Sequence, residues 1–190
     1  MTDRFADAMA FAESLHRGQR RKSSGCPYIA HLLGVASLVM EAGGTEDECI
    51  AALLHDAVED QGGARTAADI RRRFGPTVAG IVDACSEDKR RDRGWRARKE
   101  AAVRSVLDHD SSVLLVLSAD KLHNARSLRA EHRRVGDRVW DSFRGGRDGT
   151  LWYYRAMADA ISRAGGSPLA GELEAAVRIL ELLGNPESPR

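Results

Sequence analysis

The segment from residue 51 to residue 60 contains an adjacent histidine and aspartate, His55 and Asp56, followed by the acidic pair Glu59 and Asp60. On one helix, His55 and Glu59 are a turn apart, as are Asp56 and Asp60, so each pair shares a face. An imidazole nitrogen and a neighbouring carboxylate oxygen can bind one divalent ion. This mixture of ligands suits Mn²⁺, Fe²⁺ or Zn²⁺ better than Ca²⁺ or Mg²⁺.

Two distant polar residues, His31 and Asp120, lie among apolar neighbours. His31 follows Tyr-Ile-Ala and precedes Leu-Leu, and Asp120 ends the run Val-Leu-Leu-Val-Leu-Ser-Ala. A buried carboxylate without a partner is costly. A metal ion shared with the His55-Asp56 pair would remove that cost.

Each of these two residues also has an ordinary structural interpretation. His31 could be a core histidine held by hydrogen bonds, and Asp120 could form an internal salt bridge with Lys121 or Arg126. The combination with the His-Asp pair favours a metal site made by all four residues.

Helices are the elements that must position these residues, because alternation typical of strands is nearly absent and Ala, Leu, Arg and Glu abound. Thr45 and Glu48 form a capping-box pattern at the start of the helix that carries the His-Asp pair. The periodicity predicts helices over residues 5–15, 28–41, 45–60, 66–74, 78–82, 99–108, 111–128 and 150–163, and a last one from residue 168. The sequence therefore predicts one all-α bundle.

The chain has 190 residues, of which 43% are hydrophobic and 30% charged, so it fits one globular domain. We expect this domain over residues 1–184 and a short tail over 185–190. The formal charge of +1 and the short apolar runs give no indication of nucleic-acid or membrane binding. Cys26, Cys49 and Cys85 are predicted to be buried or semi-buried reduced thiols, as expected for a cytoplasmic protein.

Three segments resemble motifs of the RelA/SpoT hydrolase domain, within the HD superfamily of metal-dependent phosphohydrolases. They are residues 20–31 (RRKSSGCPYIAH), 51–60 (AALLHDAVED) and 119–126 (ADKLHNAR). Phe74-Gly75 and Glu87-Asp88-Lys89 also fall where that family has similar residues. The resemblance covers about residues 5–165 and is closest to stand-alone small alarmone hydrolases. It implies a single-domain, HD-type helical bundle.

The resemblance also implies an activity, hydrolysis of (p)ppGpp to pyrophosphate and GDP or GTP. One Mn²⁺, or another divalent transition metal, would be held by His31, His55, Asp56 and Asp120. Glu59 and Asp60 match the acidic pair that positions and activates water. A carboxylate at a helix C-terminus opposes the helix dipole, which supports a functional reason for this pair.

Contacts to a nucleotide follow from the same resemblance. Arg21 and Lys22 match a basic pair beside the nucleotide, and a guanidinium suits either a base face or a phosphate. Asn124 matches a residue that contacts the sugar. Tyr153, or alternatively Tyr154, would supply an aromatic contact, although tyrosines in an aromatic helix also serve as core.

Several points stay open. Gln61 and Ser86 stand where the family commonly has Thr, and the residue for the terminal phosphate has no clear match, with Arg144, Arg147 and Arg155 as candidates. Alternative functions are a phosphatase for another nucleotide, such as NADPH or a 5′-nucleotide, and a nucleotide-binding regulator without turnover. The last two helices could bury their apolar faces in the core or in a dimer, so both monomer and homodimer remain open.

The other four histidines receive no catalytic role. His16 is predicted to be structural, and His109 and His132 to be solvated. His123 could bind metal in principle, but its neighbours already account for the motif.

Overall fold

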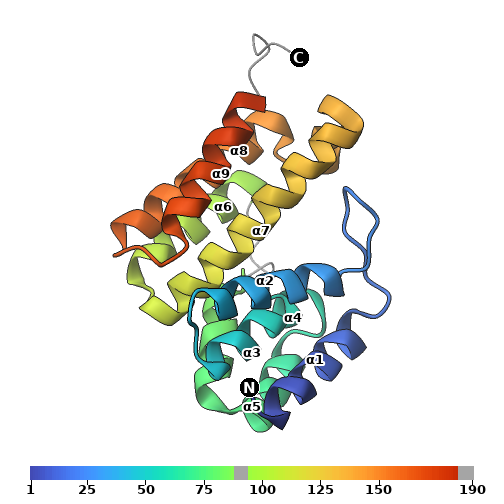
Figure 1. The fold of residues 1–190 in the computed structure, drawn as a ribbon, viewed down its shortest axis with the longest axis vertical. Coiled ribbons are helices and arrows are strands. Elements are labelled where there is room, and N and C mark those ends of the chain that lie inside the picture. Colours follow the sequence, from blue (N-terminus) through green and yellow to red (C-terminus); the bar gives the residue numbers. More distant parts are fainter. Residues whose placement is uncertain (88–93, 184–190) are drawn as a thin grey trace.

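The computed structural model describes residues 1–87 and 94–183 (Figure 1). The predicted tail over 185–190 and the pair Asp88-Lys89 lie outside the described residues. The α-helices are α1 (Asp3–His16), α2 (Ile29–Glu41), α3 (Glu46–Leu54), α4 (Ala57–Asp60), α5 (Ala64–Cys85), α6 (Trp95–Ser105), α7 (Ser111–Val135), α8 (Gly146–Arg163) and α9 (Ala170–Leu183). Two 3₁₀ helices, η1 (Val106–Asp108) and η2 (Gly136–Ser142), complete the described part.

The predicted all-α class is confirmed, since extended structure within the described ranges is limited to an isolated bridge between Arg20 and Pro27. Helix α7 is the central element and contacts α2, α3, α5, α8 and α9. It runs diagonally between the layer of α1 to α5 and the layer of α6, α8 and α9 (Figure 1). Its first half is buried over residues 113–120, because neighbours surround it on all sides.

The predicted single helix over residues 45–60 is wrong in one respect. Thr45 and Glu48 do form the capping box, but α3 ends at Leu54 and α4 begins at Ala57. Asp56, with φ −95° and ψ −4°, forms the turn between them. This break changes the directions in which the acidic residues of α4 point.

Residues 66–74 and 78–82 were predicted as two helices separated at Gly75-Pro76, and the non-helical backbone at Gly75 inside α5 confirms this break. A kink at Gly75 marks the junction, where φ is 92° and Pro76 follows. Glycine adopts this φ without steric cost, and proline removes a helical hydrogen bond. Helix α5 starts before Thr66, whose hydroxyl instead donates to the Gln61 carbonyl oxygen.

Three other helix starts differ from the prediction. Helix α6 begins at Trp95, four residues before the predicted start, and α8 begins at Gly146 in place of residue 150. The cap of α7 is Asp110, whose carboxylate accepts from the Val113 backbone N–H at 3.0 Å. A side-chain acceptor one residue earlier therefore replaces the predicted Ser111 or Ser112 cap.

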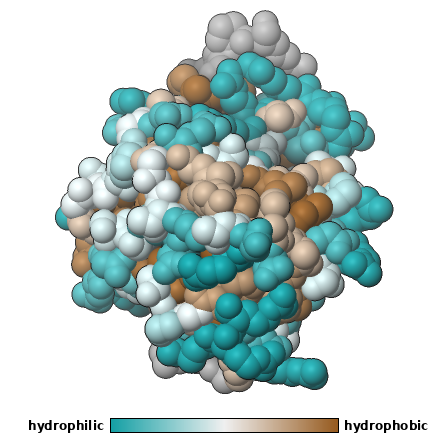
Figure 2. Space-filling model, turned by 60° about the horizontal axis from the view of Figure 1, so that its bottom comes forward, coloured by the Kyte–Doolittle hydropathy of each residue, from teal (hydrophilic) through white to brown (hydrophobic). Residues whose placement is uncertain are grey.

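The apolar face of α9 belongs to the core, because Leu173, Val177 and Leu180 are buried and α9 contacts α7 and α8. Figure 2 shows that the molecular surface combines hydrophilic areas with an apolar area on the face in view. Large apolar side chains that remain exposed include Leu33 and Met40 on α2. No helix in the described ranges has the length and apolarity needed to cross a membrane.

All three cysteines are free thiols, but they differ in burial. Cys49 is buried and Cys85 is partly buried, as predicted, whereas Cys26 is exposed. The prediction for Cys26 was wrong because this residue lies in the loop between α1 and α2, which packs little of its surface.

Candidate metal centre and active-site cavity

Four predicted ligands meet where α2, the turn after α3, and α7 come together. The Nε2 atom of His55 lies 3.1 Å from Asp56 Oδ2 and 3.6 Å from Asp120 Oδ1. The Nε2 atom of His31 lies 3.7 Å and 3.3 Å from the same two oxygens. Two imidazole nitrogens and two carboxylate oxygens thus face one point.

The burial of these atoms fits a divalent cation. His31 and His55 are 1% and 3% exposed, and neither Nε2 atom makes a hydrogen bond of regular geometry. One ligand atom each from His31, His55 and Asp56 lies within 4.8 Å of the others. Buried polar atoms without a partner are costly, and shared coordination of a cation removes that cost.

Two of the candidate ligands have outer partners that fix their orientation. The Nδ1 atom of His55 lies 2.8 Å from the Ala52 carbonyl oxygen, so Nδ1–H donates and the lone pair is on Nε2. The Tyr28 hydroxyl donates to Asp56 Oδ2 at 2.6 Å. This contribution of Tyr28 had no signal in the sequence, because Asp56 is distant along the chain.

Asp120 uses its two oxygens differently. Its Oδ2 pairs with Lys121 Nζ at 2.6 Å, and Asn124 Nδ2 donates to Oδ1, the oxygen that also faces the imidazoles. The salt bridge with Lys121 that was considered as an alternative is therefore present. It does not exclude a metal site, since Oδ1 remains directed at the two histidines.

The electrostatics of the cluster favour positive charge at its centre. Burial acts to lower the pKa of His55, but Asp56 and Asp120 outweigh burial and raise this pKa well above its usual value. Burial acts to raise the pKa of both carboxyls, yet His55 lowers that of Asp56, and Lys121 and the histidines lower that of Asp120. Two carboxylates that remain ionised in a buried site suit a bound cation.

The fourth candidate ligand, His31, has a histidine as its outer partner. Its Nδ1 atom lies 2.9 Å from Nδ1 of His123, on the side of the ring away from the carboxylates. Burial, together with the nearby His31, lowers the pKa of His123 to about 4. His123 received no role from the sequence, and the structure places it directly behind a candidate ligand.

A cavity of about 460 Å³ opens beside this centre and is lined by His55, Asp56 and Asp120. This volume is within the range that small-molecule sites occupy. Among the other predicted site residues, those on its walls are Arg21, Glu59, Asn124 and Tyr153.

The predicted acidic pair is divided by the structure. Glu59 lines the cavity, and its Oε2 atom accepts from the Glu87 backbone N–H at 3.0 Å. Asp60 is exposed and does not line the cavity. Its Oδ2 accepts from Gln19 Nε2 at 2.9 Å, and the Gln19 side-chain oxygen also contacts His16, which agrees with the structural role predicted for that histidine.

The predicted basic pair is divided in the same way. Arg21 lines the cavity, donates to Asn124 Oδ1 at 2.6 Å, and holds its guanidinium 5.7 Å from the centre of the Tyr28 ring. Lys22 is exposed and does not line the cavity.

Two cavity cations were missed by the sequence analysis, Arg98 and Lys99 on α6. Lys99 Nζ lies 4.5 Å from the centre of the Tyr153 ring and pairs with the Glu87 carboxylate. Together with Arg21, these two residues form what we call the cationic wall. No motif marked Arg98 and Lys99, because α6 is a generally basic segment.

The three arginines considered for the terminal phosphate do not line the cavity. Arg155 pairs with Glu181 at 2.6 Å, whereas Arg147 lies 3.7 Å from Asp148. His109, predicted to be solvated, does line the cavity and is partly buried, and this burial lowers its pKa.

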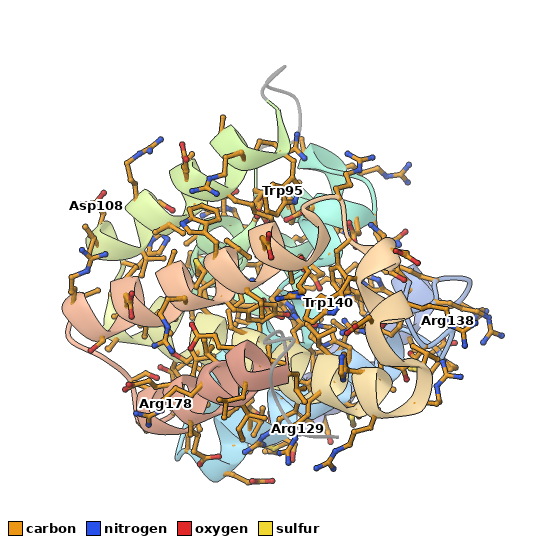
Figure 3. The ribbon with its side chains drawn as sticks, turned by 90° about the horizontal axis from the view of Figure 1, so that it is seen from above. Trp95, Asp108, Arg129, Arg138, Trp140 and Arg178 are labelled. Carbon is orange, nitrogen blue, oxygen red and sulfur yellow. The ribbon has the colours of Figure 1, made fainter. Side chains whose placement is uncertain are left out.

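Helix α6 is anchored to the start of α8 by an aromatic contact. A Cβ atom added to Gly145 would lie 2.5 Å from the Trp95 ring, and one added to Gly149 would lie 3.0 Å from it. The two glycines therefore leave the space that Trp95 occupies. The Trp95 side chain is labelled in Figure 3. Arg96 lies 3.3 Å from the centre of the Trp152 ring. These contacts fix the helix that carries Arg98 and Lys99.

Comparison with known proteins gives a consistent family. Residues 8–151 match the model of the HD domain. A Danio rerio protein named guanosine-3′,5′-bis(diphosphate) 3′-pyrophosphohydrolase MESH1 is 40% identical over 125 residues, which are 64% of this chain and 67% of that protein. The Escherichia coli K12 bifunctional (p)ppGpp synthase/hydrolase SpoT is 37% identical over 141 residues, which are 69% of this chain.

The chain spans only a small part of the longer relatives. It covers 19% of the E. coli protein and 14% of a Streptomyces coelicolor protein named GTP pyrophosphokinase, to which it is 40% identical over 124 residues. The names of these relatives describe whole proteins of which the chain matches a small part, so the activity of this chain is a proposal.

Two solved structures share the fold. A metazoan orthologue of SpoT, described as hydrolysing ppGpp, superposes with a TM-score of 0.77 and 28% identity over 94% of this chain and 96% of that one. A Listeria monocytogenes EGD-e protein superposes with a TM-score of 0.70 and 31% identity over 81% and 98% of the two chains. With the family model matched over most of its length, this chain belongs to the HD-domain family.

Proposed function

We propose that the protein is a Mn²⁺-dependent (p)ppGpp 3′-pyrophosphohydrolase that releases pyrophosphate and leaves GDP or GTP. One observation carries the proposal: two buried imidazole Nε2 atoms face two carboxylates at a cavity that also has a cationic wall. The names of the 3′-pyrophosphohydrolase relatives, of which this chain covers about two thirds, support the same reaction.

His31, His55, Asp56 and Asp120 would hold the ion. A divalent metal bound there supplies a water of lowered pKa and polarises a phosphoryl oxygen. These four side chains are kept in place by contacts with Ala52, Tyr28, Lys121 and His123.

Glu59 is the residue that we propose as general base. It lies on the cavity wall and is held by the Glu87 backbone N–H. Its carboxylate accepts the proton of the attacking water while the water oxygen bonds to the phosphorus attached to the 3′ oxygen. The bond between that phosphorus and the 3′ oxygen breaks. The 3′ oxygen takes the proton that Glu59 accepted, and pyrophosphate leaves with the oxygen of the water. Asp60 acts indirectly, through its contact with Gln19 near the same turn.

The remaining cavity residues bind the substrate. Arg98 and Lys99 offer positive charge to the pyrophosphate groups, while Arg21 and Asn124 are joined by a hydrogen bond that presents both toward the nucleoside. Tyr153 provides an aromatic ring beside Lys99. A charged ligand with several phosphates and one sugar-base unit fits this distribution.

The test measures release of pyrophosphate from ppGpp by the purified protein with Mn²⁺, before and after chelation. Compounds similar to pGpp, NADPH and 5′-nucleotides are assayed as substrates in parallel. We expect metal-dependent release of pyrophosphate with GDP as co-product. Release of phosphate from NADPH or a 5′-nucleotide, with ppGpp unchanged, would move the proposal to another nucleotide. Binding of ppGpp without any turnover would indicate a regulator.

A further inference from the structure

The outer partners of the candidate metal ligands differ in kind. His55 is held by a backbone carbonyl and Asp56 by a phenol, whereas His31 is held by the imidazole of His123. The two Nδ1 atoms are 2.9 Å apart, so one of them donates a hydrogen and the other accepts it.

The direction of this hydrogen bond follows from the chemistry of the site. A neutral histidine that binds metal through Nε2 carries its hydrogen on Nδ1. His31 Nδ1–H must then donate, and His123 Nδ1 must accept, with the hydrogen of His123 on its Nε2. The reverse assignment would place a hydrogen on His31 Nε2, where it would block coordination.

A glycine makes room for this arrangement. A Cβ atom at Gly34 would lie 2.3 Å from both Cδ2 and Nε2 of His123. His31 and Gly34 are three residues apart on α2, and Asp120 and His123 are three residues apart on α7. Because α2 and α7 pack together, the bare backbone at Gly34 lets the His123 ring lie flush against α2.

We infer that His123 is a positioning residue for the metal site: it holds His31 in the tautomer and orientation that direct its Nε2 lone pair at the ion, and Gly34 is required for this contact. His123 is not a ligand of the same ion, because its Nδ1 contacts the opposite side of the His31 ring. The inference rests on the metal site of the proposed function and does not depend on which nucleotide is hydrolysed.

The experiment measures Mn²⁺ affinity of the full chain by titrating metal-free protein with Mn²⁺ alone. His123→Phe keeps a ring but removes the acceptor, and we expect it to weaken Mn²⁺ binding by about 10–100-fold. His123→Asn restores an acceptor oxygen near the position of Nδ1, and we expect an affinity close to that of the unmodified protein. Gly34→Ala displaces the His123 ring and should weaken binding to a similar extent as His123→Phe.

Matched controls come from the same chain. Gly80→Ala adds a Cβ at a helical glycine that has open space around it, and His132→Phe removes a histidine elsewhere on α7. Both should bind Mn²⁺ normally. Circular dichroism of the metal-free variants verifies their folding.

The possible results distinguish a positioning role of His123 from a merely structural one. Unchanged Mn²⁺ affinity in folded His123→Phe would overturn the inference, and so would equal losses in His123→Phe and His123→Asn. If His123→Phe does not fold, Gly34→Ala decides: wild-type affinity in this folded variant contradicts the role of the contact. Absence of ppGpp hydrolysis in the unmodified protein, with Mn²⁺ still bound, would refute the proposed substrate and leave this inference standing.

Discussion

The metal floor, made of His31, His55, Asp56 and Asp120, and the cationic wall, made of Arg21, Arg98 and Lys99, are built in different ways. His31, His55 and Asp120 are buried, Asp56 is partly buried, and each of the four is held by a second side chain or a carbonyl. The wall residues are only partly buried and come from a loop and from α6.

This difference has a physical origin. Desolvated ligands must be held in one geometry, because a buried polar atom that loses its partner is costly. Cations that attract phosphate can act from flexible side chains at partly solvated positions. The floor should therefore respond to substitution with loss of metal and turnover, and the wall with loss of affinity for substrate.

The largest effect is expected from Asp56→Ala at the floor. Loss of a ligand that faces both imidazoles should abolish retention of Mn²⁺ and reduce turnover by more than the roughly 10²–10⁴-fold typical of losing a general base. Metal content after dialysis and initial rates of pyrophosphate release measure both. Full activity in this variant would refute the whole site assignment.

The next effect tests the division of the acidic pair. Glu59→Gln should keep Mn²⁺ and lose about 10²–10⁴-fold in kcat, since the general base is removed while the ligands remain. Asp60→Asn should lose much less, because Asp60 is exposed and does not line the cavity. Steady-state kinetics of the two variants side by side check this, and a greater loss for Asp60→Asn would reverse the assignment.

Metal binding should also stabilise the fold. An ion that binds only the folded chain, at one hundred times its Kd, raises the free energy of unfolding by about 2.7 kcal/mol. For a chain of this size that corresponds to a rise in Tm of about 5–10 °C. Thermal unfolding with and without Mn²⁺ measures the shift. In Asp56→Ala the shift should vanish, and an equal shift in that variant would place the ion elsewhere.

The smallest effect concerns the wall. Arg21→Met removes a guanidinium that lines the cavity. A hydrogen bond to a charged group is worth about 1.5–3 kcal/mol, so we expect its loss to raise KM by about 10–100-fold. Its neighbour Lys22 is exposed and outside the cavity, so Lys22→Met should change KM by less than about threefold, within what surface charges contribute. Equal increases in KM would show that the loop brings both residues to the substrate.

Much of the fold was predictable from local patterns. The helix over residues 28–41 and the capping box at Thr45 were found with nearly correct limits, because hydrophobic periodicity and caps act within one or two turns. The limits of α6 and α8 were missed by about four residues, since Trp95 and its two glycines stabilise those ends through a tertiary contact.

The sequence by itself determined which residue types the buried floor contains. A histidine and an aspartate inside apolar runs already carry an energetic demand for a partner, and that demand is local. Only the tertiary structure decided which of two adjacent residues faces the cavity: Glu59 and not Asp60, Arg21 and not Lys22. A break after Leu54 and the packing of separate helices set those directions, and neither is encoded in the spacing of the residues concerned.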